Sequence, residues 1–361
     1  MELKNLQNLE SEPEKNNYPE YIEKIFSFKI PAHQTPERLD SFLARSIGNA
    51  TRTKVQYAIE SGCVTLNNKI PKPSRKIQPG DEIYCKLMKP PPIELIPENI
   101  PLNIVYEDDV LLVVNKPAGM CTHPGFGNRY GTMVNAVLYH LGFRDTIAIE
   151  PEDEDEDYDE GEIFASDSVR PGVVHRLDKD TSGLLLVSKN PVAHAKLAEQ
   201  FANRTILREY NSIVWGRFQE DSGTYEGDIG RSLRDRKLFD IVKRGGKHAI
   251  TDFVVLEQFD CFSLVKVKLR TGRTHQIRVH FSRNRHPVLG DISYGGDSLI
   301  FGGGGDANGQ KIAKKCLSIA KRQMLHAKTL GFTHPETGEK LFFESDLPDD
   351  IKQILDILRI D

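Results

Sequence analysis

The chain has 361 residues, 39% hydrophobic and 28% charged, a composition typical of a water-soluble globular protein with about two domains. No apolar run reaches the ~18 residues of a membrane helix and no secretory signal is visible, so we expect a cytoplasmic protein without a membrane partner. The net charge of −4 argues against a nucleic-acid partner, but residues 150–162 hold ten acidic residues, and leaving these out changes the net charge to +6. We predict a disordered acidic insertion within a mildly basic body.

The N-terminal part predicts a tail followed by a small compact unit. Residues 1–25 are polar and without periodicity, so we expect them to be mobile. Thr35 and Pro36 are typical of a helix start, and Gly62 is typical of a helix end. Two helices and a hairpin are expected within a domain over residues 28–88: helices over 36–47 and 53–61, strands over 63–66 and 82–87.

Six basic residues gather around the second helix and the hairpin of this unit. They form a candidate phosphate-binding patch: Arg52, Lys54, Lys69, Lys72, Arg75 and Lys76. From composition alone, a solvated basic surface is an equally good interpretation.

Consecutive prolines in MKPPPIELIPE predict an extended linker over residues 89–98, because proline is excluded from helix interiors. The rest of the chain, residues 99–361, is expected to form one larger domain. Strands outnumber helices and follow one another closely, which favours an α+β fold on a mixed, mostly antiparallel sheet. Strands are predicted over 104–106, 110–114, 184–187, 210–215, 253–256, 264–269 and 274–279, and helices over 132–141, 191–201 and 349–358.

The strongest chemical signal is the string PGVVHRLDKDTSGLLLVSKN at residues 171–190. It places Asp178 on a turn before an apolar strand, where a rigid element can hold a catalytic carboxylate. For this string alone, a simple turn cap by Asp178 or Asp180 would be the better interpretation.

Together with four further blocks, this string resembles the signature of the RluA/RluD-type RNA pseudouridine synthases. The N-terminal unit resembles an S4-type RNA-binding domain in RLDSFLARS, AIESGCVTLNNK and IQPGDEI. The resemblance covers most of residues 28–350 and implies a pseudouridine synthase catalytic domain with a central RNA-binding cleft. The remaining blocks are NKPAGMCTHPGFGNRYGTMVNAVLYH at 115–140, TGRTHQIRVH at 271–280, HPVLGDISYGG at 286–296 and MLHAKTLGFTHPETGE at 324–339.

The resemblance also implies roles for individual residues. Asp178 is the expected catalytic carboxylate, and Tyr210 is the expected active-site tyrosine. Arg273 is the expected cation that keeps Asp178 ionised, with Arg278 as its rival. Supporting contacts to the substrate are expected from His175, Arg176, Asn115, Lys116, His123 and Arg278. Whether Asp178 attacks the sugar, attacks the base or abstracts a sugar proton stays open.

No cofactor or metal is expected, because the isomerisation of uridine needs neither oxidation nor phosphoryl transfer. Nucleotide-binding glycine motifs and H-E-x-x-H are missing from the sequence. The histidines of the family blocks are expected to orient loops rather than to bind a metal: His275, His280, His286 and His326. The five cysteines form no C-x-x-C pair, which fits free thiols.

Two other classes of protein compete with this interpretation. A non-catalytic RNA-binding or ribosome-assembly protein would lack one of the catalytic side chains, and all of them are present. A carboxylate glycosidase would need a partner acid across the scissile bond, whereas Asp180 shares the turn of Asp178. We therefore expect a monomeric isomerase that acts on RNA, with large-subunit ribosomal RNA favoured over tRNA.

Overall fold

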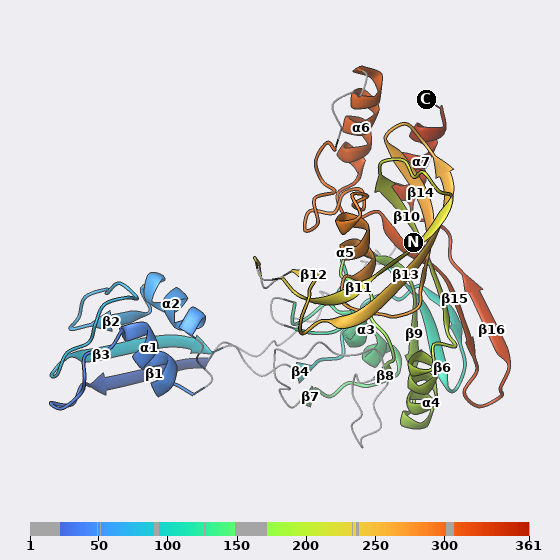
Figure 1. Cartoon of the computed structure of the whole chain (residues 1–361). Helices are drawn as coiled ribbons and strands as arrows, with labels where there is room; N and C mark the ends of the chain where they lie inside the picture. The colour runs from blue at the N-terminus through green and yellow to red at the C-terminus, as the bar shows by residue number, and fades with distance from the viewer. Residues whose placement is uncertain are drawn as a thin grey trace, which may run out of the picture. The chain divides into compact units, whose positions relative to one another are not determined.

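The computed structural model of the chain forms two units, Met1–Pro92 and Ile93–Asp361 (Figure 1). The residues that it describes are 22–48, 50, 52–89, 94–125, 128–148, 172–232, 234–235, 238–300 and 307–360. The acidic segment 150–162 and the first 21 residues of the expected tail lie outside them. Within the described residues, no helix has the length and apolar character needed to cross a bilayer.

The N-terminal unit packs two helices against a three-stranded antiparallel sheet. One core joins both layers through buried side chains such as Leu39, Leu43, Ile59 and Ile83. Directly after the strand Val64–Leu66 the chain turns at Asn67, where asparagine tolerates the required positive φ of 51°, and an isolated bridge joins Leu66 to Lys69. The elements are α1 (Leu39–Ser46), α2 (Arg52–Glu60) and the strands β1 (Ile22–Lys29), β3 (Glu82–Lys89) and β2 (Val64–Leu66), in sheet order.

Strand β1 was not predicted, and it begins at Ile22 inside the segment expected to be a tail. It pairs antiparallel with β3 over its whole length. Most of its side chains are exposed and only Phe26 and Phe28 pack against the core, so the strand has a weak hydrophobic pattern. The expectation of a mobile tail is therefore wrong for residues 22–25.

The first helix begins at Leu39, so the predicted start at Thr35 is wrong. Arg38 occupies the N-cap position with an extended backbone and no side-chain cap. The backbone N–H of Leu39 donates to Arg75 O, and an isolated β-bridge joins Arg38 to Lys76. These tertiary hydrogen bonds hold the chain extended past the local start signal.

The second unit is built on one 11-stranded sheet. Every pair in it is antiparallel except β9 with β15, which are parallel. This mixed, mostly antiparallel sheet confirms the predicted α+β class. The strands are, from one edge, β12 (Phe239–Ile241), β11 (Ser222–Arg231), β13 (Lys247–Gln258), β14 (Phe262–Leu269), β10 (Leu207–Trp215), β15 (Leu325–Thr333), β9 (Ser182–Ser188), β6 (Leu111–Lys116) and β5 (Ile104–Glu107), with β16 (Lys340–Glu344) on β15 and β8 (Gly172–Val173) on β9.

Three helices of this unit lie where the sequence predicts them. The side chains of Thr132 and Asn190 accept hydrogen bonds from backbone N–H groups of the first turn, as good N-caps do. An unpredicted helix, α6, packs with α7 over a core that contains Trp215 and Phe262. The helices are α3 (Met133–His140), α4 (Pro191–Ala202), α6 (Ala307–Ile319) and α7 (Asp349–Ile360).

The strand predicted over 274–279 is wrong, because the chain there enters helix α5 (Gln276–Arg283). Ile277, Val279 and Phe281 alternate as they would in a strand. The residues between them are buried as well, so no exposed face reveals the helical period. The polar ones have buried partners: Gln276 with Thr271, Arg278 with Asp291 and His280 with Thr251.

The predicted linker ends earlier than residue 98. Strand β4 (Glu94–Leu95) pairs with β7 (Ile147–Ala148), and Leu95 is buried in the core of the second unit. The carboxylate of Glu98 accepts the backbone N–H of Gly131 at 3.0 Å. Residues 94–98 are thus part of the second unit.

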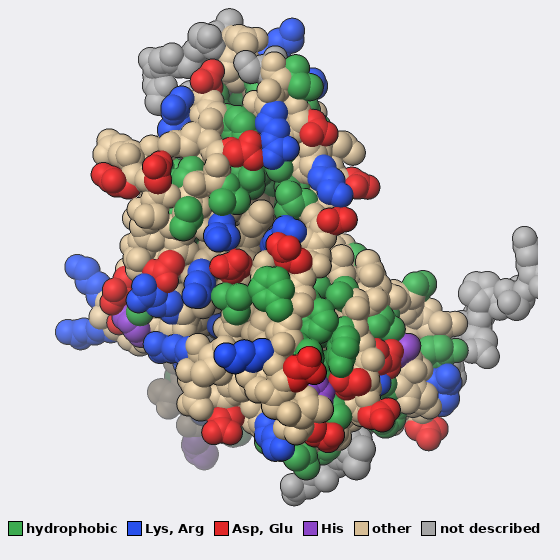
Figure 2. Space-filling view, turned by 90° about the vertical axis from the view of Figure 1, so that its right-hand side faces the viewer, with side chains coloured by type: hydrophobic (Ala, Val, Ile, Leu, Met, Phe, Trp, Pro, Cys, Tyr) green, Lys and Arg blue, Asp and Glu red, His purple; other side chains and the backbone are tan. Residues whose placement is uncertain are grey.

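Figure 2 shows the side of the second unit on which β15 and β16 lie. Acidic and basic side chains are interspersed there, with hydrophobic side chains between them. A surface of mixed sign does not attract a polyanion strongly.

Candidate active site

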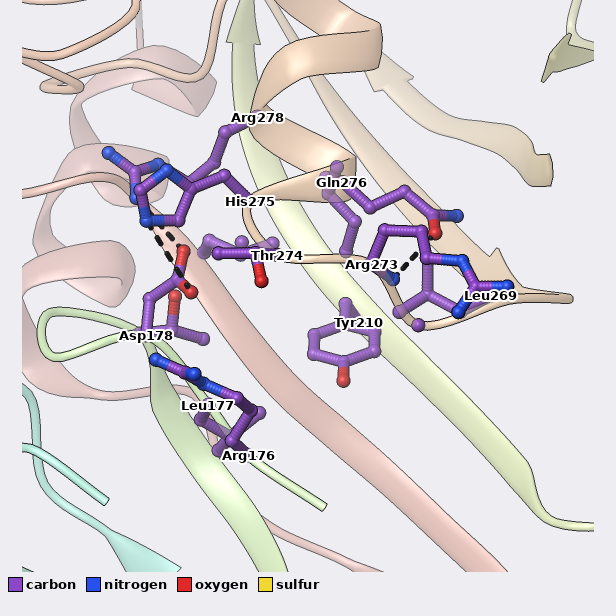
Figure 3. Close-up of a pocket in the computed structure, with 14 residues that line it drawn as sticks. Arg176, Leu177, Asp178, Tyr210, Leu269, Arg273, Thr274, His275, Gln276 and Arg278 are labelled. Atoms are coloured by element: carbon purple, nitrogen blue, oxygen red, sulfur yellow. Dashed lines mark hydrogen bonds and ion pairs between the residues drawn. The ribbon is translucent and has the colours of Figure 1, made fainter. Parts of the chain in front are cut away.

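One pocket of the second unit brings together residues from three separate segments. Asp178 lies on the turn before β9, Tyr210 lies on β10, and Arg273 and Arg278 come from the β14–α5 connection and from α5 (Figure 3). All four line the pocket together with Arg176. The three residues predicted as catalytic therefore share one cavity.

Asp178 lies on a tight turn, which the hydrogen bond from Thr181 N–H to Asp178 O closes. Behind the turn, Gly183 pairs with Ala327 across the parallel strands β9 and β15. Its φ is +117°, and an added Cβ would lie 2.2 Å from Ala327 O. Glycine is required here so that β15 can pack directly behind the turn.

Side chains from other segments fix the backbone of this turn. Lys116 is fully buried, and its Nζ donates to three carbonyl oxygens, of Pro117, Met120 and Lys179. Burial lowers the pKa of Lys116 to about 8. Its three donors are satisfied by the protein, so Lys116 supports the turn rather than the substrate, as do Thr122 Oγ1 on Leu177 O and Arg322 Nη1 on Asp180 O.

The guanidinium of Arg278 pairs directly with Asp178. Nη1 of Arg278 lies 2.9 Å from Oδ2 of Asp178, and both side chains are largely buried. The family resemblance implied Arg273 for this role, but Nε of Arg273 donates to the carbonyl of His248 at 3.1 Å. The structure corrects this choice: His275 has a left-handed φ of 56°, the chain turns there into α5, and Arg278 in the first turns of the helix meets Asp178.

Charges around the carboxyl decide its ionisation. Burial alone would raise the pKa of Asp178, but the positive charges of His275 and Arg278 and the hydrogen bond from Arg278 lower it below its usual value. Burial lowers the pKa of His275, so its positive charge acts on Asp178 only at acid pH, whereas Arg278 is charged throughout. Arg278 is then the cation paired with Asp178, which is ionised and able to act as a nucleophile or base.

His275 approaches the other oxygen of this carboxylate, and its side chain lies beside that of Arg278 (Figure 3). Its Nε2 is 4.0 Å from Oδ1 of Asp178, beyond hydrogen-bond distance, and its Nδ1 lies 2.8 Å from the hydroxyl of Tyr294. Oδ2 of Asp178 is therefore engaged by Arg278, while Oδ1 faces His275 across a gap.

Tyr210 is held in the middle of the sheet. It pairs with Val267 on β14 and with Ala327 on β15, beside an irregularity in the register at Glu209. Only 5% of its surface is exposed, yet it lines the pocket. Such a ring has a face for stacking and a hydroxyl for proton transfer.

The expected supporting residues divide into two groups. Arg176 is exposed and lines the pocket. His175 is 1% exposed, accepts the backbone N–H of Leu186 and packs against Phe201, so its expected substrate contact is wrong. Burial lowers the pKa of His123 to about 3, and Asn115 lies within β6; neither lines the pocket.

Two residues of this region were missed in the sequence analysis, although both stand in the matched block HPVLGDISYGG. Asp291 is fully buried and accepts two hydrogen bonds from Arg278. Tyr294 lies with its ring 4.9 Å from the guanidinium carbon of Arg278. The sequence did contain a signal for both residues, because they are polar and stand inside a matched block without an assigned role.

The basic patch of the N-terminal unit is on its surface. Arg52 is partly engaged, since its Nε lies 3.1 Å from a buried carboxylate oxygen of Asp40. Lys54 lies within α2. The other four members are exposed: Lys69, Lys72, Arg75 and Lys76. Among the described residues of either unit, no three His, Cys, Asp or Glu side chains gather as metal ligands do.

Comparison with known proteins identifies both units. The family model described as RNA pseudouridylate synthase matches residues 110–283, and the S4 domain model matches residues 37–83. A protein of Chlorobaculum parvum named as an uncharacterized RNA pseudouridine synthase is 46% identical over 332 residues, which cover 90% of this chain and 95% of the relative. Ribosomal large subunit pseudouridine synthase D of Neisseria meningitidis serogroup A is 37% identical over 340 residues, with 94% and 83% coverage.

A solved structure shares the fold. Human RNA pseudouridylate synthase domain containing 4 superposes with a TM-score of 0.51 at 23% identity, covering 71% of this chain and 93% of that chain. The resemblance inferred from the sequence blocks and from the N-terminal unit is confirmed.

Proposed function

The chain belongs to the RNA pseudouridine synthase family and is an isomerase that converts uridine to pseudouridine in RNA; within this family we propose that Asp178 is its catalytic carboxylate and large-subunit ribosomal RNA its substrate. The observation that carries the assignment of Asp178 is its ion pair with Arg278 in a pocket that Tyr210 also lines. Oδ1 is the reacting oxygen, because Oδ2 is engaged by the guanidinium.

The reaction breaks the bond between C1′ and N1 of uridine and forms a bond between C1′ and C5. The proton on C5 must leave and N1 must gain one, so the balance needs no oxidant or reductant. Asp178 acts on the nucleotide through Oδ1, and the Tyr210 hydroxyl serves the proton transfer. A paired base has to leave its stack to reach this pocket, and the exposed Arg176 beside Asp178 is placed to contact the RNA.

The choice of substrate is supported by the name of the Neisseria relative, which covers nearly the whole of this chain. A strain that lacks the gene should lose pseudouridine at defined positions of large-subunit ribosomal RNA, and its tRNA should be unchanged. Chemical mapping of pseudouridines in both RNA classes measures this. Loss confined to tRNA would favour the alternative substrate. The cytoplasmic location and the monomeric state stay predictions.

We also assign RNA binding to the basic patch of the S4 domain. Lys69 and Lys72 are exposed on its surface and carry charges that phosphates require. Replacing both by Gln should reduce the salt dependence of binding to a ribosomal RNA fragment, lowering the slope of log K against log salt by about 0.7–0.9 for each lost phosphate contact. Turnover on a short stem-loop should hardly change, because the chemistry lies in the other unit.

Lys340 and Lys352 provide a matched control on the catalytic unit. Both are exposed, and replacing them by Gln removes the same charge from the protein. Filter-binding titrations over a range of salt concentrations compare the two double variants. Equal slopes in both would show that only net charge, and not the patch, matters.

A further inference from the structure

Arg278 donates hydrogen bonds to two carboxylates, Asp291 and Asp178, and the two contacts differ in geometry. Its Nε and Nη2 lie 2.7 and 2.9 Å from the two oxygens of Asp291, so this ion pair is bidentate. Asp178 receives a single hydrogen bond, from Nη1 at 2.9 Å. The fork of the guanidinium, which binds a carboxylate best, is therefore turned away from the catalytic group.

The surroundings of Asp291 fix this arrangement. Asp291 is fully buried, and its Oδ1 also accepts the backbone N–H groups of Ser293 and Tyr294 at 3.0 and 3.2 Å. The ring of Tyr294 covers the guanidinium at 4.9 Å and thereby restricts its plane. The carboxylate of Asp291 is thus held independently of Arg278.

We propose that Asp291 is a positioning residue that keeps the fork of Arg278 from closing on both oxygens of Asp178, so that Oδ1 stays available for reaction. A bidentate ion pair of Arg278 with Asp178 would engage the lone pairs of Oδ1. This oxygen would then be a weaker nucleophile or base. The inference rests on the proposed catalytic role of Asp178. An inactive Asp178→Asn variant tests that role separately.

Asp291→Asn is the direct test. The amide keeps an oxygen for the two backbone N–H groups but loses the charge that attracts the fork, so Arg278 can turn to Asp178. We expect kcat to fall by about 10- to 100-fold, the factor that corresponds to one charge-assisted hydrogen bond. Binding of RNA and KM should be nearly unchanged.

The pH profile distinguishes this mechanism from simple loss of support for Arg278. A guanidinium that closes on Asp178 cannot raise the pKa of that carboxyl, so the acidic limb of the rate should stay in place or move to lower pH. A guanidinium that drifts away would move the limb to higher pH, and this result would overturn the proposal. The ionisable or charged groups that face Asp178 are Arg176 on the turn, His275 and Arg278 on the α5 segment, Asp291 and Tyr294 on the following loop, and Lys116 on β6.

Arg278→Lys supplies a second background, because an ammonium group has no fork. There the single cation is shared by two carboxylates, and adding Asp291→Asn should leave kcat unchanged or raise it. A merely structural role of Asp291 predicts a further loss in both backgrounds. That result also overturns the proposal, and it can be read even if the single variant folds poorly.

Glu257→Gln is the matched control. Arg359 binds Glu257 through Nε and Nη2 at 2.9 and 2.6 Å, which is the same bidentate geometry. Neither residue lines the pocket. Tritium release from C5-labelled uridine in a ribosomal RNA fragment gives kcat, and thermal unfolding gives the stability of each variant. Loss of turnover in this control equal to that in Asp291→Asn would show a general effect of breaking such pairs.

Discussion

Asp178→Asn should abolish pseudouridine formation, with a fall in rate of about 10⁴-fold or more, while the protein keeps its fold and binds RNA. The amide has the size of the carboxylate and can still accept a hydrogen bond from Arg278. It cannot attack C1′ or take up a proton. Tritium release from C5-labelled uridine under single-turnover conditions measures the loss, and circular dichroism and RNA binding establish that the variant is folded.

Asp180→Asn is the control on the same turn. The carbonyl of Asp180, and not its carboxylate, holds the turn through the hydrogen bond from Arg322, and this contact survives the substitution. We expect turnover within about tenfold of the unmodified protein, because no reacting group is lost. A comparable loss in both variants would contradict the assignment of Asp178.

Local sequence signals were sufficient where the structure depends on local hydrogen bonds. Thr132 and Asn190 cap their helices with their own side chains; α4 begins at the predicted residue and α3 one residue after it. Strand β1 depends on a partner some sixty residues away along the chain, and most of its side chains are exposed, so its sequence carries little pattern. The first helix was displaced for the same kind of reason, since the bridge of Arg38 to Lys76 is tertiary.

The site shows the same division. Matched sequence blocks were sufficient to predict that Asp178, Tyr210 and an arginine meet in one pocket. The identity of the arginine that pairs with Asp178 depends on whether the chain after His275 is helical or extended. That choice is made by burial on every side of α5, which a linear pattern does not contain. Arg273 was chosen from its position in the block TGRTHQIR, and that position does not show which arginine meets Asp178 once the chain after His275 is helical.

Arg278→Met should move the acidic limb of the pH–rate profile to higher pH and lower the rate at pH 7 by about 10²–10³-fold. In the unmodified protein the pKa of Asp178 is lowered, with Arg278 among the causes. Removing this cation leaves two buried carboxylates, Asp178 and Asp291, without a shared partner, so one of them takes up a proton more readily. The acidic limb moves to higher pH because a reacting carboxylate with a raised pKa is already protonated at a higher pH.

The same variant should lose stability, by about 3–5 kcal/mol, because breaking a buried ion pair leaves an unpaired charge. A carboxyl with a lowered pKa stabilises the fold above its unfolded pKa and loses this contribution as pH falls, so the difference in unfolding free energy should be largest at neutral pH and shrink toward acid pH.

Arg273→Met provides the comparison: it removes a guanidinium that lines the pocket and should raise KM, with the acidic limb unchanged. Rate profiles of both variants decide the matter, and a limb that moves only with Arg273→Met would reverse the assignment of the cation.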